Sequence, residues 1–87
     1  MELTEEIRHF VFEKYLKPAR DEGKTKVVVV SGDVHSRMGL KNRMPAVCNA
    51  LRAEKFQEKY NIQLIQEVRL PSVKGDSSTN QFSFSLK

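Results

Sequence analysis

Four consecutive valines, Val27 to Val30, restrict the folding of this 87-residue chain more than any other feature. β-Branched side chains lose rotamer freedom in a helix but fit the pleated surface of a strand, so the run predicts a strand over 26–30. It is also the longest apolar run, and the mean hydropathy is -0.51, so nothing in the sequence predicts a transmembrane helix. We therefore expect a globular domain built around this strand.

The residues before the strand have the spacing of an amphipathic helix. Apolar side chains recur every three to five positions, at Leu3, Ile7, Phe10, Val11 and Leu16. Proline disfavours helical geometry at the residue before it, so Pro18 predicts that this helix ends near Leu16.

A short helix and a longer one are predicted after the strand. Val34 and Met38 lie four residues apart on one face of the short helix, and Gly39 suits the left-handed residue that ends it. Pro45 fits the first turn of the longer helix, which begins at Asn42 or at Met44 and runs to Lys59 or Tyr60. One face of the longer helix is expected to be buried, and it consists of Met44, Val47, Cys48 and Leu51. The opposite face consists of Asn42, Ala46, Asn49 and Ala53.

The last third of the chain predicts a hairpin. Residues 62–70 form a strand whose alternation is interrupted at Ile65, and residues 71–80 have the composition of a loop. Phe82, Phe84 and Leu86 then alternate with serines, which is typical of a strand with one buried face. The chain is therefore expected to form one α+β domain over 1–87, with three helices and a small antiparallel sheet in the order α-β-α-α-β-β.

Positive charge is concentrated in the middle of the chain. Residues 1–22 hold six acids and four bases, residues 23–60 hold three acids and eight bases, and residues 61–87 hold two acids and three bases. The net charges of these segments are −2, +5 and +1, which sum to the formal +4, and the pI is about 9.4. A basic middle segment favours a polyanionic partner.

The cysteine content and the first six residues indicate in which cellular compartment the protein is expected. Cys48 is the single cysteine, so it forms no internal disulfide and is expected to be a small core residue. The segment Met1 to Glu6 is acidic and unlike a secretory signal. These features predict a reduced, cytoplasmic protein without a membrane partner, a metal or another cofactor.

The order of the elements resembles the winged helix-turn-helix superfamily, and the likeness covers nearly the whole chain. Its centre is residues 33–40 followed by residues 41–51, with Gly39 and Leu40 resembling the turn between the two helices of the motif. The resemblance places the helix-turn-helix at about 32–60 and the wing hairpin at about 62–86. It implies binding of double-stranded DNA, with the second motif helix in the major groove, by a transcriptional regulator or a recognition module without catalytic activity.

The resemblance and the charge pattern together nominate a set of DNA-binding residues. An exposed Asn49 is suited to a bidentate pair with adenine, and the small Ala46 allows close approach of the helix. Arg43 and Arg52 flank this face and are suited to phosphate or a guanine edge, and Lys74 lies in the predicted wing loop. The full set of predicted contacts is Lys41, Asn42, Arg43, Ala46, Asn49, Arg52 and Lys74.

Other interpretations stay open at the level of sequence. The same residues are compatible with a solvated helix face, or with a winged helix that docks on a protein partner, and the oligomeric state is undetermined. The segment Gly32-Asp33-Val34-His35 resembles the first metal-binding segment of calcineurin-like metallophosphoesterases. That site needs further histidines, and His9 is the single other one, so an enzyme of this class is a remote alternative.

Overall fold

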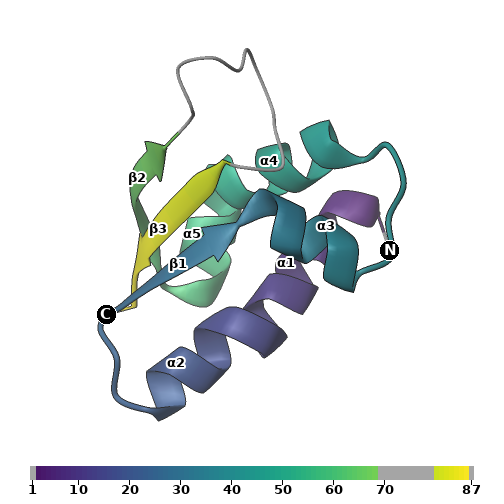
Figure 1. Cartoon of the computed structure of the whole chain (residues 1–87). Coiled ribbons are helices and arrows are strands. Elements are labelled where there is room, and N and C mark those ends of the chain that lie inside the picture. Colours follow the sequence, from purple (N-terminus) through teal and green to yellow (C-terminus); the bar gives the residue numbers. More distant parts are fainter. Residues whose placement is uncertain (1, 69–79, 87) are drawn as a thin grey trace.

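Short helices and a three-stranded antiparallel sheet make up the described part of the chain, which confirms the predicted α+β class. The computed structural model describes residues 2–68 and 80–86. Figure 1 shows the sheet with helix α5 behind it. The elements in chain order are α1 (Leu3–Val11), the π-helical turn η1 (Phe12–Leu16), α2 (Lys17–Asp21), β1 (Lys26–Val30), α3 (Ser31–Arg37), α4 (Met44–Arg52), α5 (Glu54–Tyr60), β2 (Gln63–Val68) and β3 (Gln81–Ser85).

The first helical segment is longer than predicted, and this is one correction to the expected order of elements. It continues past Leu16 as α2 and ends at Asp21. A proline ring normally clashes with the carbonyl four residues earlier in an α-helix. Here the backbone before Pro18 is π-helical, with the Lys17 N–H donating to the Phe12 carbonyl five residues earlier. This wider turn accommodates the ring, so Pro18 does not end the helix.

The sheet has β3 in its centre, with β1 and β2 antiparallel on either side. The valine strand is confirmed as β1, and β2 is observed over Gln63–Val68 within the predicted 62–70. Leu64 is opposite Phe84 and Gln66 is opposite Ser83, so Ile65 is an extra residue in a bulge. The bulge explains why the alternation in the sequence is interrupted there.

The second motif helix is divided into two, which is the other correction. Ala53 has extended backbone angles, φ −71° and ψ 138°, and it separates α4 from α5. Of the alternatives that the sequence left open, Met44 is the observed start, of α4, and Tyr60 is the observed end, of the separate helix α5. The break rotates Phe56 into the core, where it is 0% exposed, whereas a straight helix would place it on the outer side.

The core lies between the inner face of the sheet and the helices. Val29, Phe82 and Phe84 supply the sheet side of it, and Cys48 is buried as predicted. The remaining buried apolar residues are Ile7, Val11, Leu16, Ala19, Val34, Val47, Ala50, Leu51, Phe56, Ile62 and Leu86. Among the described residues, no helix has the length and apolar character needed to cross a bilayer.

Candidate nucleic-acid interface

Helix α4 is held by its buried face, which leaves the other face exposed to solvent. Val47, Cys48 and Leu51 are buried, as predicted, and Ala50 is buried beside them. These residues pack α4 against α1 and α3 (Figure 1). Pro45 lies in the first turn, where its missing N–H removes no helical hydrogen bond. The exposed Asn49 is therefore displayed on a helix fixed by the core.

A basic turn precedes α4. Lys41, Asn42 and Arg43 are all exposed, and Asn42 adopts left-handed angles with φ 54°. The backbone N–H of Arg43 donates a hydrogen bond to Nε2 of His35 at 3.2 Å, which attaches the turn to α3. The turn thus presents two bases next to the positive end of the α4 dipole.

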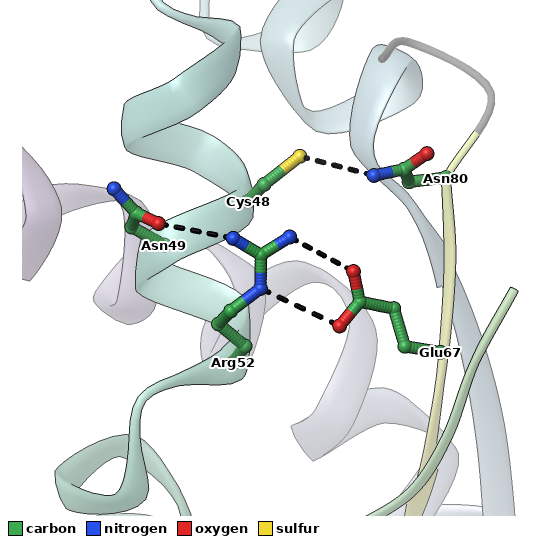
Figure 2. A network of polar contacts seen from close by, with 5 residues as sticks. All are labelled: Cys48, Asn49, Arg52, Glu67 and Asn80. Carbon is green, nitrogen blue, oxygen red and sulfur yellow. Dashed lines mark hydrogen bonds and ion pairs between the residues drawn. The ribbon is translucent and has the colours of Figure 1, made fainter. Parts of the chain in front are cut away.

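Asn49, Arg52 and Glu67 form one polar network, shown in Figure 2. Arg52 donates from Nε and Nη2 to the two carboxylate oxygens of Glu67, at 3.4 and 2.8 Å. Its Nη1 donates to Oδ1 of Asn49 at 3.0 Å. The side chains of Arg52 and Glu67 are 27% and 20% exposed, so their ion pair is only partly screened by water.

Glu67 is the member of this network that the sequence analysis missed. It lies on β2, 15 residues after Arg52, and it faces Phe82 of β3 in the register of the sheet. The guanidinium of Arg52 also lies over the Phe82 ring, 6.0 Å from its centroid. No local pattern signals such a pair, because its members meet only when the sheet packs against α4.

The charged residues of the chain segment that contains α4 have one sign. Residues 34–53 contain four bases and no acid. Two of the four bases are paired, Arg52 with Glu67 and Arg37 with Asp33 at 3.9 Å. Over residues 2–68 and 80–86, no acid lies within ion-pair distance of Lys41 or Arg43. The uncompensated positive charge is therefore on the turn before α4.

The predicted contact residues fall into three groups. Lys41, Asn42, Arg43 and Asn49 are exposed, and Ala46 is half-buried one turn before Asn49. Arg52 is partly buried and bound to Glu67. Lys74 lies outside the described residues, so its role in the wing stays a prediction.

The Gly-Asp-x-His segment makes structural contacts in α3. Asp33 accepts a hydrogen bond from the Tyr15 hydroxyl, and the guanidinium of Arg37 lies over the Tyr15 ring, 5.1 Å from its centroid. Burial raises the pKa of Tyr15 above its ordinary value, and the bond to Asp33 acts in the same direction. No group of three or more His, Cys, Asp or Glu side chains suited to a metal ion occurs among the described residues.

A second contact seen in Figure 2 ties the start of β3 to the helices. The side chain of the buried Asn80 donates from Nδ2 to Sγ of Cys48 at 3.7 Å. The backbone carbonyl of Asn80 accepts from the backbone N–H of Ser31 at 3.0 Å. Cys48 therefore has a structural role at the junction of α4, α3 and β3.

Comparison of the chain with protein-family models, with curated proteins and with solved structures found no match.

Proposed function

We propose that this protein is a winged helix-turn-helix that binds double-stranded DNA and catalyses no reaction. In this proposal α3 and α4 form the helix-turn-helix, α4 enters the major groove, and β2 and β3 are the strands of the wing hairpin. The element order and the sheet order β1-β3-β2 support it, as does the packing of α3 against α4. Regulation of transcription is the role that follows from such binding.

The observation that carries the proposal is the uncompensated charge beside α4. Lys41 and Arg43 are exposed, and no described acid neutralises either of them. Phosphate contacts supply most of the affinity of non-specific DNA binding, and they come from bases of this kind. Lys41 and Arg43, two exposed bases in the turn before α4, match this requirement.

The dimensions of α4 suit a groove. The helix has nine residues and is therefore about 14 Å long. The major groove of B-DNA is about 12 Å wide and admits one α-helix. The half-buried Ala46 beside Asn49 leaves space for a base edge on this face.

A salt-dependent titration tests the proposal. Affinity of the full chain for mixed-sequence duplexes is measured by fluorescence anisotropy between about 50 and 200 mM salt, and we expect a steep fall as salt rises. The double variant Lys41→Ala/Arg43→Ala should weaken binding to all duplexes and reduce the salt slope by about two units. Lys17→Ala is the matched control, because Lys17 is an exposed base on the distant α2 (Figure 1). Absence of binding at about 50 mM salt would refute the proposal.

Exposed apolar residues of the sheet favour one alternative, a winged helix that binds a protein. Val28 and Val68 lie on the face of the sheet away from the core, and they are 47% and 37% exposed. Ile65 in the adjoining bulge is 48% exposed. Large exposed apolar patches are typical of protein contacts, and these residues lie on the two outer strands of the sheet, with β3 between them. A duplex titration without binding would favour this alternative.

A further inference from the structure

We propose that the pocket between α1 and α5 is a binding site for a small phosphate monoester. The pocket has a volume of about 210 Å³ and is lined by Glu5 and Arg8 of α1 and by Lys55, Lys59 and Tyr60 of α5. Three of these side chains are bases and one is an acid, so the lining has a net charge of +2. The inference does not depend on DNA binding, because α4 contributes none of these residues.

Helical spacing brings the charged side chains of each helix to one side of it. Glu5 and Arg8 are three residues apart on α1, and Lys55 and Lys59 are four residues apart on α5. Ile7, the residue before Arg8, is a buried core residue. Arg8 therefore lies beside the buried face of α1, where it lines the pocket together with the two lysines of α5.

Arg8 is the residue that points to a ligand. It is only 6% exposed. Among residues 2–68 and 80–86, its guanidinium has neither a hydrogen-bond acceptor nor a carboxylate within ion-pair distance. Arginine is almost never buried to this extent without a partner, because removal of its charge from water is costly. The fold therefore holds a guanidinium whose charge a bound anion would compensate.

The pocket gives an anion access to this guanidinium. Among the described side chains, the fully enclosed nitrogen and oxygen atoms without a partner are Nε of Arg20 and Oδ1 of Asn80. The unpaired nitrogens of Arg8 therefore keep some contact with solvent. Because Arg8 lines the pocket, an anion in the pocket can accept hydrogen bonds from them.

The charge of the lining matches a phosphate group. The planar guanidinium can donate two parallel hydrogen bonds to one phosphate, and lysine ammonium groups add point charges. Lys55 and Lys59 are exposed, and their like charges repel each other at this spacing, which a bound anion relieves. A phosphate monoester carries a charge of about −1.5 to −2 at pH 7, close to the opposite of the lining, whereas a carboxylate carries a single charge.

Calorimetric titration of the full chain with glycerol 3-phosphate at pH 7 and constant ionic strength tests the site. We expect saturable binding at one site, and weaker binding of acetate. Arg8→Met should weaken the affinity roughly 10- to 150-fold, the effect of a lost charge-assisted hydrogen bond. Lys55→Gln and Lys59→Gln should each weaken it about 2- to 5-fold, because both charges are exposed. Lys17→Ala is the matched control, since it removes an exposed charge on α2 and should leave the affinity unchanged.

Thermal unfolding gives a readout that a purely structural role of Arg8 would not produce. In chloride buffer Arg8→Met should melt no lower than the wild type, because the change removes an unpaired buried charge. Glycerol 3-phosphate should raise the Tm of the wild type and leave that of Arg8→Met unchanged. The double variant Lys55→Gln/Lys59→Gln alters only exposed side chains, so it tests the site if Arg8→Met does not fold.

The outcomes separate this inference from the proposed function. The wild type failing to bind glycerol 3-phosphate saturably, or Arg8→Met binding it equally well, would overturn the inference. Equal affinity for acetate would overturn the assignment to phosphate, and displacement by a DNA duplex would assign the pocket to the DNA backbone instead of a small ligand. Lys41→Ala/Arg43→Ala should lose affinity for duplexes and keep its affinity for glycerol 3-phosphate, so either proposal can fail without the other.

Discussion

Phe56 tests whether the break at Ala53 is the correct description of the second motif helix. In a continuous helix the residue five positions after Leu51 is rotated from it by about 140°, which would place Phe56 outside the core. In the structure its side chain is 0% exposed. Its ring makes edge contacts with Phe84 and Tyr60, at centroid distances of 5.6 and 5.5 Å.

The expected cost of Phe56→Ala follows from these contacts. Truncation of a fully buried phenylalanine lowers the free energy of unfolding by about 3–5 kcal/mol, because the apolar transfer energy is lost and a cavity remains. A domain of this length has a free energy of unfolding of about 4–13 kcal/mol. The melting temperature should therefore fall by roughly 15–25 °C.

Urea unfolding followed by circular dichroism measures this loss. Phe12→Ala is the matched control, because Phe12 stacks on the same Tyr60 ring at 4.5 Å but is only half-buried. It should cost about 1–2 kcal/mol. Phe56→Leu, expected to lose about 1–2 kcal/mol, replaces the alanine variant if that variant does not fold. A loss below about 0.5 kcal/mol for Phe56→Ala, the range of surface substitutions, would refute the break at Ala53.

Two further predictions concern side chains that join distant helices. Arg20 donates from Nη2 to the carbonyls of the last α5 residue and of the residue after it, at 3.0 and 3.1 Å. Arg20→Ala should lower the free energy of unfolding by about 1–3 kcal/mol in urea, and an unchanged midpoint would contradict these bonds. Because the pKa of Tyr15 is raised in the folded state, the unfolded chain loses the Tyr15 hydroxyl proton at a lower pH than the folded chain does. The contribution of Tyr15 to stability should therefore be complete below its ordinary pKa of 10.0 and decrease as pH rises above it. This alkaline decrease should be smaller in Tyr15→Phe, and an identical profile would show that Tyr15 is not its source.

Local pattern was sufficient for much of the secondary structure. The four valines indicated β1 because branched side chains lose rotamer freedom in a helix and fit the pleated surface of a strand. Gly39 ends the α3 region with φ 68°, as a residue without a Cβ allows. The helical periodicity of Val47 and Leu51 identified the buried face of α4, and with it the exposure of Asn49.

The backbone geometry of the folded chain and contacts between distant segments decided the rest. Pro18 remains within a helix because a π-helical turn precedes it, and the burial of Phe56 depends on an extended Ala53 that no local signal indicates. The partner of Arg52, Glu67, comes from β2, the strand that follows α5 in the chain, and this pair holds the guanidinium that also donates to Asn49. Periodicity tells which face of a helix is buried, but hydrogen-bond partners and side-chain orientation are fixed only when the sheet packs against that helix.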